Sequence, residues 1–159
     1  MRLPGEKLTT LDKLSRRLDP AVRRGARVVL ANGVFDLLHV GHLRYLVAAR
    51  SLGDRLVVAV NSDASTRAYK GPSRPIIPEA ERAELVAALE CVDDVIVFDE
   101  PNVEEVLRTL RPDVHAKGTD YTPETIPERA VVESYGGVVA VCGDPKDHSS
   151  TELIEKTKR

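Results

Sequence analysis

The chain has 159 residues, with 23 Lys and Arg against 25 Asp and Glu and a formal net charge of −2. This length suits one compact domain, and the near-neutral charge argues against a nucleic-acid partner, which would favour a clear basic excess. No apolar run approaches the ~20 residues of a membrane span, and no signal peptide is recognisable, so no membrane association is expected. Cys91 and Cys142 are isolated thiols without a C-x-x-C motif, which favours a cytoplasmic location over a redox function.

Five short runs rich in β-branched residues are predicted to form strands, at 27–31, 55–61, 94–98, 113–116 and 138–142. Helical stretches are predicted between and after them, at 40–52, 79–90, 103–110, 127–135 and 151–158. The strand runs are almost continuously apolar, which is typical of strands covered on both faces. The alternation of strand and helix predicts a single α/β domain, a five-stranded parallel sheet with helices on both faces.

The first 24 residues are predicted to form a helical extension ahead of a core over 25–159. Leu8, Leu11, Leu14 and Leu18 have helical spacing, so a helix is expected over 8–18. In an open parallel sheet, ligands bind at the carboxyl ends of the strands, where the strand order reverses. The residues that follow each predicted strand are therefore the candidates for a site.

The first predicted strand runs into Asn32-Gly33-Val34-Phe35-Asp36-Leu37-Leu38-His39-Val40-Gly41-His42. Gly33 permits a tight exit from the strand, and Gly41 allows close approach of a ligand to a helix start, where free amides favour an anion. His39 and His42 are three residues apart, so both can face one side of the first helical turn and donate to phosphate oxygens. Alternatively, one histidine caps the helix and the other packs in the core. No cysteine or carboxylate lies at metal-ligand spacing nearby, so no metal site is predicted.

The second predicted strand is followed by Asn61, Ser62 and Asp63, of which Ser62 or Asp63 could cap a short helix or contact a ligand. Lys70 and Arg74 follow in a Gly- and Pro-rich loop without helical spacing. Such a loop suits the phosphates of a nucleotide or a sugar phosphate, and a plain solvated loop is the alternative.

Arg82 opens the next helix, and it is either a surface partner of Glu79 or Glu81 or a further phosphate ligand. The fourth predicted strand ends in Lys117-Gly118-Thr119-Asp120-Tyr121, where Asp120 could bind a base or ribose or be an ordinary turn residue. Hydroxyl groups follow the fifth strand at the start of a helix, where they either cap that helix or cap it and contact phosphate. These are Ser149, Ser150 and Thr151.

The pattern Gly33-x-Phe35-Asp36-x-x-His39-x-Gly41-His42 resembles the signature of the H-x-G-H nucleotidylyltransferase superfamily. The family transfers a nucleotidyl group from a nucleoside triphosphate to a phosphate-bearing acceptor, and its fold is Rossmann-like. The segments Lys70-Gly71-x-x-Arg74-Pro75 and Lys117-Gly118-x-Asp120-Tyr121 look like those of heptose 1-phosphate adenylyltransferases, which occur alone or within a bifunctional heptose kinase/adenylyltransferase. The sequence departs from that family at Ser149-Ser150-Thr151, where Ser-Thr-Thr is usual. The alternative is a cytidylyltransferase acting on glycerol 3-phosphate or another sugar or polyol phosphate.

The resemblance implies transfer of AMP from ATP to D-glycero-D-manno-heptose 1-phosphate, giving ADP-heptose and pyrophosphate, with Mg²⁺ accompanying ATP. It implies small-molecule substrates and a homodimer or homotetramer. A nucleotide-binding module without activity is the alternative from another class. The residues that it implies for catalysis are His39, His42, Lys70 and Arg74. Those that it implies for substrate binding are Asn32, Gly33, Phe35, Asp36, Gly41, Asn61, Asp63, Arg82, Lys117, Gly118, Asp120, Ser149, Ser150 and Thr151.

Overall fold

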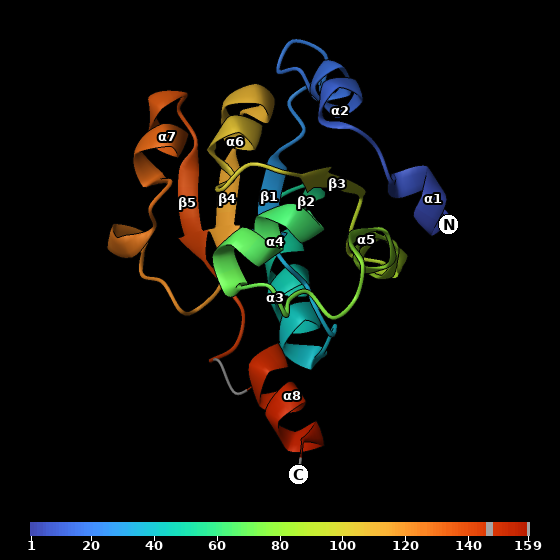
Figure 1. Cartoon of the computed structure of the whole chain (residues 1–159). Coiled ribbons are helices and arrows are strands. Elements are labelled where there is room, and N and C mark those ends of the chain that lie inside the picture. The colour runs from blue at the N-terminus through green and yellow to red at the C-terminus, as the bar shows by residue number, and fades with distance from the viewer. Residues whose placement is uncertain (146–147, 159) are drawn as a thin grey trace.

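A computed structural model of the chain describes residues 1–145 and 148–158. Within these residues, five strands pair in parallel in the order β3-β2-β1-β4-β5 (Figure 1). The strands are β1 (Val28–Gly33), β2 (Arg55–Asn61), β3 (Asp94–Phe98), β4 (Val114–Lys117) and β5 (Val138–Val141). The five-stranded parallel sheet predicted from the sequence is therefore confirmed.

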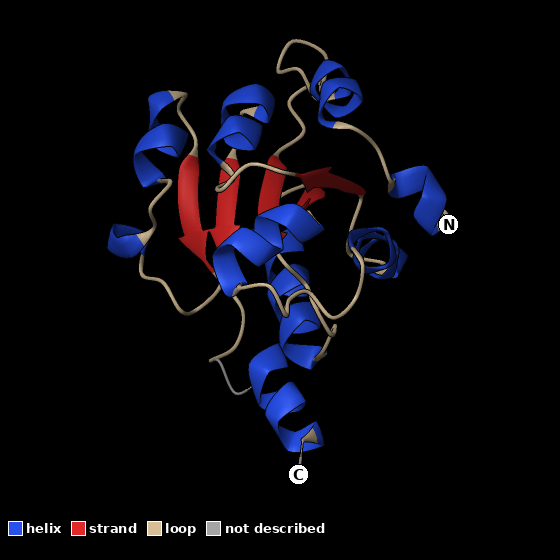
Figure 2. Ribbon diagram, viewed as in Figure 1, coloured by secondary structure: helices blue, strands red, loops and turns tan. Residues whose placement is uncertain are grey.

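Successive side chains of each strand point to opposite faces of the sheet, and each face has its own helical cover (Figure 2). In β1, Val29 and Ala31 belong to one buried cluster, whereas Val28 and Leu30 belong to the other. The helices of the first cluster are α3 (Val40–Arg50) and α5 (Glu79–Ala88), and those of the second are α2 (Leu11–Arg17), α6 (Glu104–Leu110) and α7 (Arg129–Ser134). Helices on both faces, as predicted, account for the continuous apolar strands.

The remaining described elements are α1 (Pro4–Lys7), α4 (Asp63–Lys70), a 3-10 turn η1 (Pro123–Thr125) and α8 (Ser150–Thr157). Figure 1 shows α8 beyond the carboxyl ends of the strands, next to α3. None of the described helices is long and apolar enough to cross a membrane.

The strand order reverses at β1, because β2 and β3 lie on one side of it and β4 and β5 on the other. The register between β1 and β4 ends with Ala31 beside Ala116. Beyond that pair, β1 continues to Gly33 before the chain turns toward α3, and β4 ends at Lys117 before the chain turns toward η1. A crevice is expected between two strand ends that diverge in this way.

The predicted helix over 8–18 is wrong in its first turn. Leu8 instead pairs with Val95 at the edge of the sheet, and the amide of Thr9 donates to the carbonyl of Val95. Thr10 then caps α2, since its hydroxyl accepts from the amide of Lys13 at 3.3 Å. The helix therefore begins at Leu11, and the division between an extension over 1–24 and a core over 25–159 stays a prediction.

Candidate functional site

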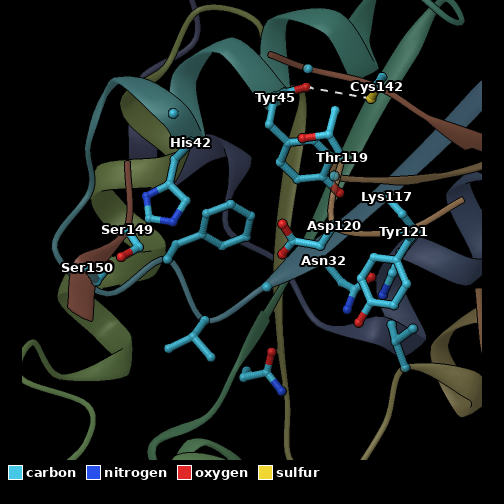
Figure 3. Close-up of a pocket in the computed structure, with 18 of the residues that line it drawn as sticks. Asn32, His42, Tyr45, Lys117, Thr119, Asp120, Tyr121, Cys142, Ser149 and Ser150 are labelled. Atoms are coloured by element: carbon cyan, nitrogen blue, oxygen red, sulfur yellow. Dashed lines mark hydrogen bonds between the residues drawn. The ribbon is translucent and has the colours of Figure 1, made fainter. Parts of the chain in front are cut away.

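A pocket of about 530 Å³ lies at the carboxyl edge of the sheet. Its walls come from the ends of β1, β2 and β4, from the start of α3, and from the segment between β5 and α8. Figure 3 shows His42, Ser149 and Ser150 on one side of the pocket and Lys117 and Tyr121 on the other. The pocket therefore lies where the reversal of strand order predicts a ligand site.

Fourteen of the eighteen residues predicted for the site line this pocket, although they come from segments far apart in the sequence. They are Asn32, Gly33, Phe35, His39, Gly41, His42, Asn61, Lys70, Lys117, Gly118, Asp120, Ser149, Ser150 and Thr151. The other four form two ion pairs outside the pocket wall, Asp36 with Arg74 and Asp63 with Arg82.

The two histidines form the start of α3. The His39 side chain caps the helix, because its Nδ1 accepts from the amide of Gly41 at 3.1 Å. Nδ1 of His42 accepts from the amide of His39 at 3.4 Å, and the two rings stack with their centroids 3.8 Å apart. A neutral imidazole whose Nδ1 accepts a hydrogen bond carries its proton on Nε2. Each ring can therefore act as an Nε2–H donor at a helix N-terminus, which itself favours an anion.

The turn between the histidines leaves little room for a side chain at Gly41. A Cβ atom on Gly41 would lie 3.0 Å from Cε1 and Nδ1 of the His39 ring. A side chain at this position would press the ring away from the helix start by a few tenths of an ångström. The glycine of the His-x-Gly-His pattern thus allows the capping histidine to fold back over the helix start.

The opposite wall carries a buried cation. The Lys117 side chain is 10% exposed, and its Nζ lies 3.6 Å from Oε1 of Glu128 and 4.6 Å from the centre of the Tyr121 ring. Glu128 precedes α7 without capping it, and its Oε2 is buried with no hydrogen-bond partner. Lys117 is therefore fixed at the end of β4 by one carboxylate and one aromatic face.

The start of α8 closes the pocket beside the histidines. Ser149 caps the helix, because its hydroxyl accepts from the amide of Glu152 at 3.1 Å. Both alternatives for this segment include a cap, so the contact with phosphate stays a prediction. The hydroxyl of Ser150 donates to the backbone carbonyl of Asp36. That bond holds the start of α8 against the loop after β1. The pocket therefore has a second helix N-terminus beside it, with backbone amides that lack partners within the helix.

The carboxylate of Asp36 is buried and organises the loop after α4. It accepts from the amides of Ile76 at 2.8 Å and Ile77 at 3.0 Å, and from Nε of Arg74 at 3.0 Å. Burial by itself would raise the pKa of Asp36, but the two amides and the Arg74 guanidinium outweigh it and lower the pKa below the usual value. Asp36 therefore holds a loop and engages Nε of Arg74 outside the pocket wall, and the predicted contact of Arg74 with phosphate stays a prediction.

Asp36→Asn is expected to lower the free energy of unfolding by about 1–3 kcal/mol at neutral pH. The side-chain NH₂ of the asparagine would face hydrogen-bond donors that now donate to both carboxylate oxygens of Asp36. The folded pKa is depressed, so this contribution is present above the unfolded pKa of about 3.9 and is lost as the pH falls through the folded value. Urea titrations between pH 3 and pH 8 should show that the difference in the free energy of unfolding between wild type and variant becomes smaller in acid. Asp12→Asn, at an exposed ion pair with Arg16, is the control. A gap that stays constant into acid would contradict this assignment.

Arg82 is completely buried, so the surface ion pair with Glu79 or Glu81 is wrong, and it does not reach the pocket wall either. Its guanidinium donates to the carbonyls of Val34, Asn61 and Ile77 and to Oδ1 of Asp63. These four acceptors belong to the loop after β1, the end of β2, the loop before α5 and the start of α4. Arg82 therefore joins the segments behind the pocket, and its predicted contact with phosphate stays a prediction.

Lys70 is the last residue of α4, so its predicted place in an irregular loop is wrong. The helix is capped by Ser62, whose hydroxyl accepts from the amide of Ser65 at 3.1 Å. Gly71 follows with φ of +98°, a conformation that ends the helix and that other residues rarely adopt. The side chain of Lys70 is exposed at the pocket rim, where the helix end places it.

Several residues of the site were missed from the sequence. Tyr45 lies three positions after His42 on α3, a helical spacing that could have indicated it, and its hydroxyl donates to the carbonyl of Ala116 at 2.7 Å. Cys142 lines the pocket, and burial raises the pKa of its thiol to about 11, which makes it a poor nucleophile at neutral pH. Glu128 has no local signal, because only the fold brings it to Lys117.

The residues described contain no group of three or more His, Cys, Asp or Glu side chains that could hold a metal ion. Their donor set therefore does not fit a metal cage made by the protein. Magnesium bound through phosphates and water would need no such cage.

The sheet order, the pocket at its switch point and the His-x-Gly-His helix start define a Rossmann-like domain of the nucleotidyltransferase class. Residues 30–156 match the family model described as Cytidylyltransferase-like. The chain belongs to the cytidylyltransferase-like family, and the resemblance that the motifs predicted is confirmed.

The chain is similar to curated proteins named Bifunctional protein HldE. It is 53% identical over 150 residues to that of Syntrophotalea carbinolica, covering 94% of this chain and 31% of the relative. It is 51% identical over 152 residues to that of Geotalea uraniireducens, covering 96% of this chain and 31% of the relative. The chain thus spans about a third of the length of the curated relatives it matches.

Two solved structures are also similar. The lipopolysaccharide core biosynthesis protein from Thermoplasma volcanium has 34% identity and a TM-score of 0.62, over 74% of this chain and 94% of that one. The pantoate-beta-alanine ligase from Francisella tularensis has a TM-score of 0.60 over 95% of this chain and 76% of that one. At 14% identity, the second similarity concerns the fold alone.

Proposed function

We propose that the chain transfers AMP from ATP to D-glycero-D-manno-heptose 1-phosphate, forming ADP-heptose and pyrophosphate. The observation that carries the proposal is the arrangement of His39 and His42 at the start of α3. Their rings stack, and Nδ1 of each ring accepts a hydrogen bond from a backbone amide. Two Nε2–H donors at one helix N-terminus form a site for the charge that develops on a phosphoryl group. The family membership and the HldE relatives support the same class of reaction.

The chemistry needs no nucleophile from the protein. The phosphate of a sugar 1-phosphate is largely a dianion at neutral pH, since its second pKa is about 6. One of its oxygens attacks the α-phosphorus of ATP, and the bond from that phosphorus to the bridging oxygen breaks as pyrophosphate leaves. The protein has to align two anions and neutralise the growing charge.

The pocket divides these tasks between its walls. In the proposal, His39, His42 and the α8 start at Ser149 bind the triphosphate, and Lys70 at the rim neutralises the leaving pyrophosphate. Lys117 and Asp120, at the end of β4, lie on the side available to the nucleoside or the sugar. Magnesium would accompany the triphosphate as its counterion, held through phosphate oxygens and water.

Arg74 and Arg82 have a supporting place in this proposal. Arg74 is bound to Asp36 and Arg82 to Asp63, so their charges are balanced within the protein. They shape the loops around the pocket, and we assign the binding of substrate charge to side chains that line it, namely His39, His42, Lys70 and Lys117.

A second candidate is a cytidylyltransferase acting on glycerol 3-phosphate or another polyol phosphate, which the family description Cytidylyltransferase-like favours. The two candidates share the phosphate chemistry and differ only in the base and the acceptor. A panel of ATP, CTP, GTP and UTP against heptose 1-phosphate, glucose 1-phosphate and glycerol 3-phosphate separates them, with pyrophosphate release as the readout.

If the proposal is right, we expect the highest kcat/KM for the pair of ATP and heptose 1-phosphate. Preference for CTP with glycerol 3-phosphate would replace it by the second candidate. Nucleotide binding without pyrophosphate release from any pair would favour a module without catalytic activity.

A further inference from the structure

His115 is a fully buried polar side chain in the middle of β4, next to the switch point of the sheet. Its Nε2 lies 2.9 Å from Oδ1 of Asn32, and its Nδ1 is buried with no hydrogen-bond partner. A buried imidazole with one unpartnered nitrogen is costly compared with an apolar side chain of similar size. The side chain that partners its Nε2, Asn32, belongs to the pocket wall.

The tautomer of His115 follows from its surroundings. Burial lowers the pKa of His115 to about 3, and the nearby positive charge of Lys117 adds to that effect, so the ring is neutral. An unpartnered bare nitrogen costs less than an unpartnered buried N–H, which places the proton on Nε2. His115 therefore donates, and Oδ1 of Asn32 accepts.

This bond fixes the carboxamide of Asn32. In β4, His115 pairs with Leu30, and Asn32 is two residues beyond Leu30 in β1, so both side chains lie on the same face of the sheet. Main-chain pairing of the two strands stops at Ala31 and Ala116, so the side-chain bond bridges the base of the crevice. With Oδ1 of Asn32 engaged, Nδ2 is the group that can donate to a ligand, and Asn32 lines the pocket near Lys117 and Tyr121 (Figure 3).

We propose that His115 is a positioning residue that orients Asn32, so that the amide Nδ2 donates to an oxygen of the bound nucleoside triphosphate. This inference rests on the proposed function only in its choice of ligand. His115 itself touches no substrate in this proposal. It holds Oδ1 of Asn32, so that Nδ2 of Asn32 points in one direction at the switch point of the sheet. The carboxamide is then set before the ligand arrives, which lowers the entropy lost on binding.

The test is a double-mutant cycle read by calorimetric titration with a non-hydrolysable ATP analogue. Asn32→Ala is expected to weaken binding about tenfold, the effect of one hydrogen bond. His115→Leu should weaken it by a similar factor, and the double variant should bind no more weakly than Asn32→Ala, because both changes remove the same interaction. His115→Gln, which keeps a donor, should recover part of the affinity.

Val114→Ala is the matched control, since Val114 is buried on the same strand and has no polar contact to make with Asn32. It should lower the thermal midpoint and leave the affinity unchanged. If His115→Leu fails to fold, His115→Met and His115→Gln supply the same comparison. Wild-type affinity in the apolar variants, or additive losses in the double variant, would overturn the proposal.

The outcome is separable from that of the proposed function, because the titration requires no acceptor and no turnover. If wild type binds CTP and not ATP, the cycle is run with a CTP analogue. Non-additive losses from the His115 and Asn32 substitutions would then support the positioning role of His115, whereas the assignment of ATP as substrate would fail. If wild type binds neither nucleotide, both are overturned.

Discussion

His42→Ala is expected to lower the turnover number at least about 100-fold, which is the scale of losing one donor to developing charge. Its ring stacks on His39 and meets Phe35 edge-on at 5.3 Å between centroids, and its Nδ1 accepts from the backbone. Nε2 is therefore the donor that substitution removes. The measurement is pyrophosphate release at saturating substrates, with circular dichroism to confirm the fold.

The control for this variant is Leu43→Ala, one position further along α3, where the side chain is 40% exposed and does not line the pocket. It should retain wild-type turnover. His42→Gln keeps a donor without a ring and should fall between wild type and alanine. Near-normal pyrophosphate release from His42→Ala would exclude the proposed role of the α3 start.

Arg82→Met is expected to destabilise the protein by about 3–5 kcal/mol, the range for breaking a buried charged network by removing one partner. The substitution leaves Asp63 without its cation and three carbonyls without a donor. Arg82→Lys should recover little, since an ammonium group cannot reproduce the planar fork that reaches four acceptors. Urea unfolding followed by circular dichroism measures both variants.

Arg108→Met provides the comparison, because Arg108 forms an exposed i, i+4 pair with Glu104 on α6. Its loss should cost no more than about 0.5 kcal/mol. An Arg82→Met protein as stable as Arg108→Met would show that the buried network contributes little to stability. Any change in kcat beyond that explained by the unfolded fraction would show that the network also shapes the pocket.

The sheet could be predicted because its signals are local. Each strand is a short apolar run, and the segment from Asn32 to His42 carries the strand exit, the glycines and both histidines within eleven residues. The start of α2 was also readable, since Thr10 is a preferred capping residue before Leu11. The spacing of the leucines led to a helix start at Leu8 instead, because Leu8 has the helical spacing although its backbone pairs with β3.

The polar interior could not be predicted, because its partners are distant in sequence. His115 and Asn32 are 83 positions apart, and Asp36 meets Arg74 across 38. A lone Arg at a helix start looks like a surface residue, so nothing local shows that Arg82 is buried among carbonyls. Lys70 was misplaced because α4 is polar and is followed by glycine and proline, which hid the helix before them.

The groups of this pocket that would attract a polyanion have a consequence for its behaviour in salt. Two helix starts, at α3 and α8, supply oriented amides, and the lysine of the opposite wall is largely buried beside Glu128. Mobile ions screen exposed charges over about 8 Å at physiological ionic strength, but they screen partly buried groups such as these less. The attraction for a polyanion should therefore persist in concentrated electrolyte, unlike that of a surface cluster of lysines.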